Sequence, residues 1–168
     1  IFFSLISCTQ DRIKTYKTPK EILPVIQLVK PNSQLNWSIP SSWIEKPLDS
    51  FRKASYDVPL LSGSSADFSI VSFPGDVGGL LSNVNRWNNQ LGLPPISVTE
   101  LDQIKTKITH NYLDIILFDL RSSNEAIVVA TFPFNNEFYF FKLFFKDLSS
   151  VNEVKNELIR VLDELEIK

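Results

Sequence analysis

The chain has 168 residues, of which 43% are hydrophobic and 21% charged, and its formal net charge is −2 at pH 7. This length suits one domain with its own apolar core, and the composition is that of a folded protein rather than a disordered or collagen-like chain. The 17 Lys and Arg residues are outnumbered by 19 Asp and Glu residues and form no basic run. Because phosphate binding needs a concentrated basic surface, we expect no nucleic-acid partner.

The single cysteine, Cys8, directly follows an apolar run at residues 1–7. Residues 5–8, Leu-Ile-Ser-Cys, resemble the lipobox of bacterial lipoproteins. That resemblance implies that residues 1–7 are the remnant of a signal peptide, cleaved before Cys8, and that acyl chains such as palmitate are attached to the new N-terminus. A lone cysteine also has no partner for a disulfide. The alternative is a first core strand with a buried thiol, since free cysteine is commonly buried.

Residues 8–34 are polar and punctuated by prolines, which indicates a lipidated N-terminus and a tether to the membrane. About 25 extended residues at roughly 3.3 Å each would hold a domain tens of ångströms from the membrane. The apolar patch at residues 22–29 leaves a second interpretation open, because so short a stretch also fits a helix or strand packed on the domain. The folded domain is then expected to comprise residues 35–168.

The first part of this domain favours antiparallel strands, because apolar residues alternate with polar ones and turn residues separate the runs. The predicted strands are residues 35–39, 51–58 and 66–73. A turn at residues 40–43, which contains Trp43, follows the first of them.

Two helices are predicted next. Apolar residues between Val77 and Leu91 recur every three or four positions, which is typical of an amphipathic helix, and Gly92 is suited to end it. Ser97 and Glu100 have the spacing of a capping box, which indicates a second, short helix whose apolar stripe reaches Ile108.

The second half of the domain indicates a meander and a last helix. Hairpin-length connections join three predicted strands, at residues 112–120, 125–134 and 138–145. Ser150 and Glu153 form another capping-box candidate before an amphipathic stripe. The three strands are apolar at consecutive positions, so both faces of their sheet must be covered. We therefore predict an α+β fold, an α/β/α sandwich on a mainly antiparallel sheet, with the last helix on one face and the helix from Val77 on the other.

Two stretches resemble known proteins. Residues 39–43, Ile-Pro-Ser-Ser-Trp, are similar to the Pro-x-x-Trp turn that often opens domains of the PsbP and DcrB type, and the order of elements also resembles that type. Residues 73–94 resemble a signature of uncharacterised bacterial envelope lipoproteins. In that group a glycine commonly follows the phrase at residues 140–143, where this chain has Phe144. The resemblance implies a PsbP-like fold and a membrane-anchored place on the periplasmic face of the cell envelope, and it implies no activity.

The same block holds the candidate site. Glycines at a helix start leave backbone N–H groups and the positive end of the helix dipole available to an anion. Alternatively, they permit a tight turn or close packing, with Asp76 as the helix N-cap. The outer helix face could hold a carboxylate, a sugar or a partner loop, or it is solvated with Trp87 in the core. The candidate ligand-binding or partner-binding residues are Gly75, Asp76, Gly78, Gly79, Asn83, Arg86, Trp87 and Gln90.

The inventory of reactive residues argues against an enzyme. His110 is the single histidine, no Gly-x-Ser-x-Gly motif occurs, and one His with one Cys cannot form a structural zinc site without unusual carboxylate use. We expect no catalytic residues, no metal and no cofactor. A hydrolase would require His110 within hydrogen-bond reach of a serine in a cleft.

Residues 132–145 are rich in aromatic side chains, which indicates a dense core or, if a strand there lies at the sheet edge, a docking surface. The function favoured by these observations is a lipid-anchored, non-catalytic accessory or assembly factor that contacts another envelope protein. The alternative is a small anionic ligand-binding protein that uses residues 74–79 and Arg86. That alternative requires a pocket of roughly 300 Å³ or more at this helix start. A hydrolase is the third hypothesis.

Overall fold

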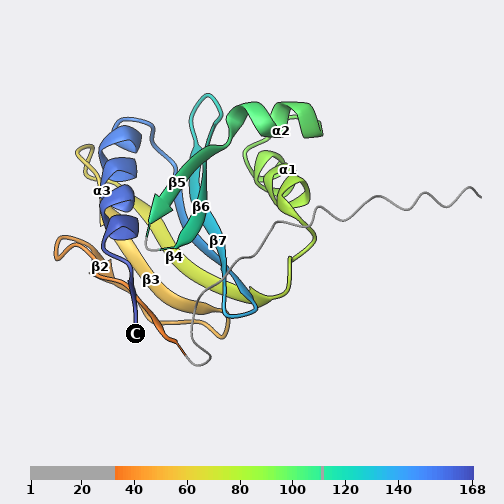
Figure 1. Ribbon diagram of the computed structural model, residues 1–168. Helices are drawn as coiled ribbons and strands as arrows, with labels where there is room; N and C mark the ends of the chain where they lie inside the picture. The colour runs from red at the N-terminus through yellow and green to blue at the C-terminus, as the bar shows by residue number, and fades with distance from the viewer. Residues whose placement is uncertain (1–32, 111) are drawn as a thin grey trace, which may run out of the picture.

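An antiparallel sheet forms the centre of the domain in the computed structural model, which describes residues 33–110 and 112–168 (Figure 1). Within these residues the strand order is β2-β3-β4-β8-β7-β6-β5. The strands are β2 (Ile44–Glu45), β3 (Arg52–Pro59), β4 (Ser65–Pro74), β5 (Thr106–His110), β6 (Leu113–Arg121), β7 (Ala126–Phe134) and β8 (Glu137–Phe145). A separate ribbon of β1 (Leu35–Asn36) and β9 (Glu166–Ile167) joins the two ends of the domain. The predicted lipidation site Cys8, the tether and the patch at residues 22–29 lie outside the described residues.

Helices cover both faces of this sheet (Figure 1). Helix α3 (Val151–Asp163) packs on one face, and α1 (Leu80–Gln90) with α2 (Val98–Ile104) packs on the other. Consecutive residues of β7 alternate between the two cores, with Val128 facing α3 and Val129 facing α1. This alternation explains why the strands are apolar at every position. The predicted fold class, α+β with an α/β/α sandwich on an antiparallel sheet, is confirmed.

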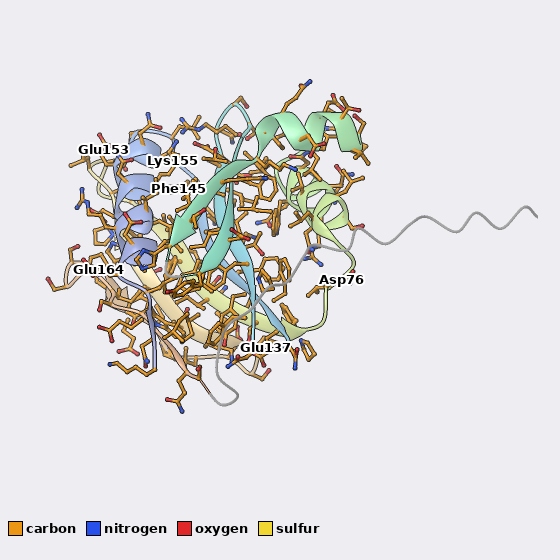
Figure 2. All side chains as sticks on the ribbon, in the orientation of Figure 1. Asp76, Glu137, Phe145, Glu153, Lys155 and Glu164 are labelled. Carbon is orange, nitrogen blue, oxygen red and sulfur yellow. The ribbon has the colours of Figure 1, made fainter. Side chains whose placement is uncertain are left out.

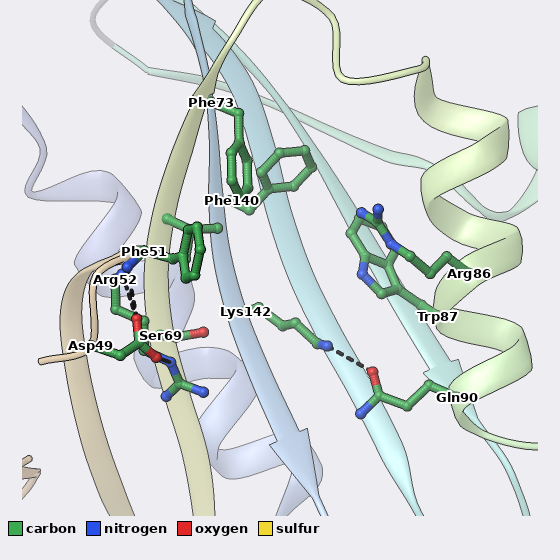
Figure 3. Close-up of a pocket in the computed structure, with 11 residues that line it drawn as sticks. Asp49, Phe51, Arg52, Ser69, Phe73, Arg86, Trp87, Gln90, Phe140 and Lys142 are labelled. Carbon is green, nitrogen blue, oxygen red and sulfur yellow. Dashed lines mark hydrogen bonds and ion pairs between the residues drawn. The ribbon is translucent and has the colours of Figure 1, made fainter.

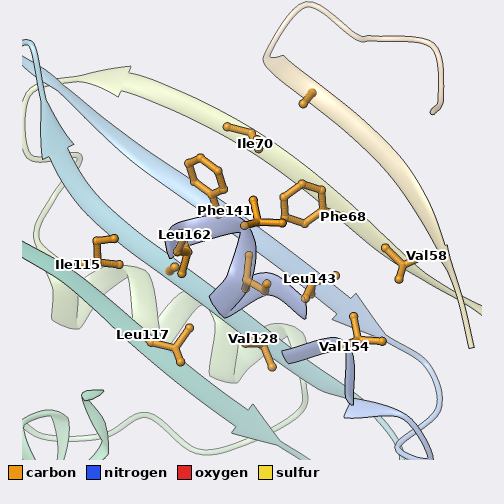
Figure 4. Close-up of a cluster of buried hydrophobic side chains, with 14 of the residues drawn as sticks. Val58, Phe68, Ile70, Ile115, Leu117, Val128, Phe141, Leu143, Val154 and Leu162 are labelled. Carbon is orange, nitrogen blue, oxygen red and sulfur yellow. The ribbon is translucent and has the colours of Figure 1, made fainter. Parts of the chain in front are cut away.

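The core on the α3 face is built mainly from the central strands and the apolar stripe of α3 (Figure 4). Phe68 of β4, Phe141 of β8 and Leu162 of α3 are fully or almost fully buried in it. Burying an apolar side chain of this size contributes about 1.5–3 kcal/mol each, so this layer accounts for much of the driving force for folding.

The aromatic-rich residues 132–145 belong to the core. Phe132, Phe141 and Phe145 face α3, whereas Phe138 and Phe140 face α1. Strand β8 lies between β4 and β7 and is therefore central rather than an edge strand. The core interpretation of this stretch is confirmed.

The β7–β8 hairpin closes through two asparagines. Asn135 and Asn136 have φ values of 49° and 62°, the left-handed conformation that a two-residue hairpin of matching twist requires. Asparagine tolerates this conformation better than most residues with a side chain, so the Asn-Asn pair favours the register that pairs Phe134 with Glu137.

Four local predictions were wrong. The strand predicted at residues 35–39 is limited to β1, which pairs with β9 and not with the other strands of the predicted set. Residues 106–110 do not extend the second helix but form β5, where Ile108 pairs with Ile115 of β6. The helix predicted from Val77 begins at Leu80. Ser150 does occupy the N-cap position of α3, but its hydroxyl makes no capping bond and instead accepts the N–H of Leu61 at 3.2 Å. The predicted capping box at Ser97 and Glu100 of α2 is present.

Candidate ligand-binding pocket beside helix α1

Helices α1 and α2 cover only part of their face of the sheet. Their apolar contacts are mainly with β6, β7 and β8, and Val71 and Phe73 of β4 pack against the same cluster, but polar residues interrupt this face. Ser55 of β3, Ser69 of β4 and Lys142 of β8 are successive neighbours across this face. These polar residues interrupt the apolar layer beside α1, and a pocket lies there.

The pocket has a volume of about 280 Å³ (Figure 3). Its walls come from the loop before β3, from β3, β4 and β8, and from the last two turns of α1. The lining residues are Asp49, Phe51, Arg52, Ser69, Val71, Phe73, Arg86, Trp87, Gln90, Phe140 and Lys142.

Two cations face this pocket without a carboxylate partner. The Arg86 guanidinium donates a hydrogen bond to the side-chain oxygen of Asn83, and the Lys142 ammonium donates to Oε1 of Gln90 at 2.9 Å. Among residues 33–110 and 112–168, neither cation forms an ion pair with an Asp or Glu. Both therefore hold a positive charge beside the cavity, and their side-chain hydrogen bonds go to neutral amides.

The third cation of the pocket, Arg52, is neutralised. Its guanidinium donates to both carboxylate oxygens of Asp67, at 3.0 and 3.2 Å. Burial raises the pKa of Asp67, but the hydrogen bonds from Arg52 and Lys46 outweigh that effect, so the pKa lies below its ordinary value. This charge cluster lies on β3, on β4 and just after β2, and it leaves Arg86 and Lys142 as the available positive charges.

The pKa of Lys142 is lowered from 10.5 to about 8. Burial is the largest cause, because a charged amine loses hydration in the cleft between β8 and α1. The positive charge of Arg86 lowers it further, and the charge of Asp67 acts in the opposite direction. An anion bound between Arg86 and Lys142 would raise this pKa again.

The opposite wall of the pocket is apolar. Phe73 and Phe140 lie with ring centroids 6.4 Å apart, and Val71 lies beside them on β4. Phe51 is 72% exposed and lines the pocket (Figure 3). Its loop is held by Asp49, whose carboxylate accepts the N–H of Phe51 at 2.8 Å and that of Arg52 at 2.9 Å.

Four of the candidate residues lie on α1, and three of them line the pocket: Arg86, Trp87 and Gln90. Trp87 is only 4% exposed and packs edge-on against Phe140 at 5.9 Å, so it is both a core residue and a wall. Asn83 is 1% exposed and does not line the pocket. Its amide donates to the carbonyl oxygens of Val77 and Gly79, at 3.3 and 2.8 Å, while its oxygen accepts from Arg86. Asn83 thus holds Arg86 in position.

The glycine-rich turn that precedes α1 does not line the pocket. Gly75, Gly78 and Gly79 have φ values between 74° and 83°, and a Cβ atom at any of them would meet nothing within 4 Å. Backbone conformation rather than close packing therefore requires these glycines. Val77 shares the turn with a φ of 46°, which is an outlier for a β-branched residue.

Asp76 closes this turn and is not the N-cap of α1. Its carboxylate accepts the N–H of Gly78 at 3.2 Å, and its carbonyl oxygen accepts that of Gly79 at 2.9 Å. The N-cap is Gly79, which has no side chain to cap the helix. Anion binding at this helix start stays a prediction.

The pocket residues outside α1 were missed by the sequence analysis. Lys142 carries a recognisable signal, because it is the single charged residue in the run Phe138–Phe145 of β8. A charge in an otherwise buried strand indicates either an ion pair or a site. Arg52 and Phe51 give no such signal, because polar and aromatic residues are ordinary at strand ends and on exposed loops, and Ser69 is a small polar residue in an alternating strand.

A second pocket, of about 380 Å³, lies between α3 and the turn at residues 38–42. Glu157, Arg160 and Glu164 of this region place charges of both signs around it. Trp43, in the turn that resembles the PsbP type, donates its indole N–H to Glu157 at 2.8 Å and packs on Phe68 at 4.7 Å. Through Trp43, the turn therefore connects the start of the domain to α3.

His110 ends strand β5 and does not line the pocket beside α1. Its Nε2 lies 3.2 Å from the carbonyl oxygen of Leu165, just beyond α3. In the described part of the chain, no group of three or more His, Cys, Asp or Glu side chains could hold a metal ion. None of the helices between residues 33 and 168, residue 111 aside, is long and apolar enough to cross a bilayer.

No family model and no curated protein matches this sequence. Two solved structures are similar to it in fold. One, from Bacteroides thetaiotaomicron VPI-5482, is 12% identical with a TM-score of 0.47, and the match covers 80% of this chain and 45% of that one. This chain therefore spans less than half of that protein. The other is LpqN, involved in cell envelope biogenesis of Mycobacterium tuberculosis, at 13% identity and a TM-score of 0.47, covering 81% and 84% of the two chains. Likenesses at this level assign no activity.

Proposed function

We propose that this protein is a non-catalytic accessory protein of the bacterial cell envelope that binds an anionic group of a partner or ligand in the pocket beside α1. The observation that carries this proposal is the convergence of Arg86 and Lys142 on one pocket, with no carboxylate partner for either in residues 33–110 and 112–168. In the proposed complex the ligand supplies the missing negative charge.

Energetic reasoning supports this assignment. A cation removed from water without an opposite charge destabilises the folded state, and the lowered pKa of Lys142 reports that effect. Chains retain such unfavourable groups mainly where a binding site uses them. The pocket, at about 280 Å³, lies just below the usual range of ligand sites, so it suits one small group rather than a large cofactor.

The proposed place in the envelope rests on the sequence. The lipobox-like residues 5–8 support attachment to the membrane through a lipid on Cys8, and the resemblance of residues 73–94 to envelope lipoproteins supports the periplasmic face. Mass spectrometry of the protein extracted from bacterial membranes tests this part. We expect a chain that begins at Cys8 and carries acyl groups, and a Cys8→Ser variant that is neither cleaved nor acylated. An uncut, unmodified leader in the parent protein would contradict the anchoring.

Titration of the ¹⁵N-labelled chain with acetate and with inorganic phosphate tests the anion site. We expect saturable changes in the NMR signals of Arg86, Gln90 and Lys142, and loss of those changes in Arg86→Gln and Lys142→Gln. Arg160→Gln is the matched control, because Arg160 is exposed on α3 and removing it changes the net charge equally. Equal responses of the three variants would refute the site.

A further inference from the structure

We infer that the anionic group bound by Arg86 and Lys142 is the C-terminal carboxylate of a partner protein whose last side chain is apolar. This inference rests on the proposed function and names the chemistry of its ligand. It unites two properties of the pocket, the cations on α1 and β8 and the apolar side chains that β4 and the loop before β3 contribute among their polar ones.

The cationic wall suits a carboxylate. The guanidinium of Arg86 presents donors in a planar fork that matches two carboxylate oxygens, and Lys142 adds a second charge from the neighbouring strand. Figure 3 shows both side chains reaching into the space between α1 and β8. Such an arrangement recognises the end of a chain by its charge.

Further polar groups of the pocket suit the peptide backbone next to a terminal carboxylate. Gln90 uses its oxygen to accept from Lys142, which leaves its NH₂ group able to donate to a carbonyl. The side chain of Ser69 lines the pocket, and its hydroxyl makes no hydrogen bond within the described ranges 33–110 and 112–168. Both groups can therefore hydrogen-bond to the amide that adjoins a terminal carboxylate.

The apolar wall suits the last side chain. Phe51, Phe73 and Val71 form this wall, and most of the Phe51 ring is exposed to solvent. A large aromatic side chain held over a pocket by an ordered loop is stabilised when a ligand covers it. If the apolar side chain of a ligand covers about half of this ring, the buried area adds to the affinity, and this gain depends only on the apolar part of the ligand.

The size of the pocket favours a chain end over other carboxylates. The volume of about 280 Å³ lies just below the usual range of ligand sites, which suits a small group. A terminal carboxylate and one side chain fill this space. An acidic side chain within a folded loop would bring neighbouring residues with it, and a long alkyl chain would extend beyond the pocket.

Four probes test this inference by NMR titration of the full chain: N-acetyl-phenylalanine, its amide, N-acetyl-alanine and octanoate. We expect N-acetyl-phenylalanine to bind at least about tenfold more tightly than its amide, because a hydrogen bond to a charged group changes a binding constant by that much. We expect it to bind several-fold more tightly than N-acetyl-alanine and octanoate. Arg86→Gln and Lys142→Gln should each lower the affinity for N-acetyl-phenylalanine by about tenfold.

The Phe51→Ala variant distinguishes the contribution of the apolar side chains to binding from that of the charges. We expect it to lower the affinity for N-acetyl-phenylalanine several-fold and to leave the affinity for N-acetyl-alanine unchanged. Leu61→Ala is the control, since Leu61 is 85% exposed and does not line the pocket. Because both residues are exposed, both variants should retain the thermal unfolding temperature of the parent, which circular dichroism checks.

The outcomes distinguish this inference from the proposed function. If N-acetyl-alanine binds as tightly as N-acetyl-phenylalanine, and through Arg86, the anion site stands and the apolar part of the inference is wrong. Octanoate binding as tightly as N-acetyl-phenylalanine would overturn the assignment to a protein C-terminus in favour of a fatty carboxylate. If neither the probes nor acetate perturbs Arg86 and Lys142, both proposals fail.

Discussion

Replacement of Lys142 by methionine should stabilise the protein at pH 7. The pKa of Lys142 is lowered from 10.5 to about 8, mainly by burial and further by the charge of Arg86. At 1.36 kcal/mol for each pKa unit, the charged amine destabilises the folded state by about 3 kcal/mol relative to its neutral form. Methionine has a similar length and no charge, so Lys142→Met should raise the free energy of unfolding by up to about 3 kcal/mol, a large part of the 5–15 kcal/mol of a typical domain.

The pH dependence of stability provides the sharper assay. Because the folded-state pKa is the lower one, the unfolded chain binds more protons between about pH 8 and pH 10.5, and the free energy of unfolding of the parent rises with pH across this window. Below pH 8 the destabilisation is fully present. The Lys142→Met variant lacks this contribution, so its stability advantage, measured by urea unfolding, should be largest at pH 7 and shrink toward pH 10.5.

Lys146→Met is the control for the general effect of removing a lysine. Lys146 follows β8 and is exposed, so its replacement should change the free energy of unfolding by less than about 0.5 kcal/mol. The reasoning would be refuted if Lys142→Met were less stable than the parent at pH 7, or if its advantage were equal at pH 7 and pH 10.5.

Other positions give further expectations, each measured by urea unfolding. Trp87→Ala should destabilise the domain by about 3–5 kcal/mol, because Trp87 is almost fully buried against Phe140 and Phe118; a loss below about 1 kcal/mol would contradict its place in the core. Gly78→Ala should cost about 1 kcal/mol or more, because its φ of 83° disfavours any residue with a Cβ, although a Cβ would meet no neighbour there. Thr131→Val should be neutral or stabilising by about 1 kcal/mol, since the buried Thr131 hydroxyl has no hydrogen-bond partner in the described part of the chain; a clear loss of stability would reveal a partner.

The layers of the fold could be predicted because their signal is local. Val128 and Val129 are neighbours in sequence and face opposite cores, so an uninterrupted apolar run already implies a sheet covered on both faces. The capping box of Ser97 and Glu100 lies within four residues and is equally local.

Strand β5 could not be predicted from local pattern. Ile108 is four positions after Ile104, so residues 104–108 fit a helical stripe, and the same five-residue stretch also alternates like a strand. Pairing with β6 decides between the two, because Ile108 then lies opposite Ile115 and packs on the α3-side core. Tertiary contacts outweigh the weak preference of so short a segment.

The candidate site could be predicted only in part for the same reason. Arg86, Trp87 and Gln90 share one helix, and helical periodicity places them together. Lys142 joins them only because α1 packs on the sheet, where Lys142 donates to Gln90 across 52 positions of sequence, and the pairing of β4 with β8 adds Ser69. The glycine-rich turn, although the most prominent motif, serves to start the helix that carries Arg86.

The position of α1 explains why a destabilising lysine is compatible with this fold. Trp87 packs on Phe140 of β8, and the next residue of β8 on the same face is Lys142, which pairs with Ser69 of β4. An apolar residue at position 142 would extend the α1-side core toward β4 and remove half of the positive wall of the pocket. Stability and anion binding are thus opposed at a single side chain. If Lys142→Met both stabilises the domain and abolishes binding of N-acetyl-phenylalanine, one charge accounts for both effects. If it stabilises the domain and leaves binding intact, Lys142 is an unfavourable buried charge without a role in the site.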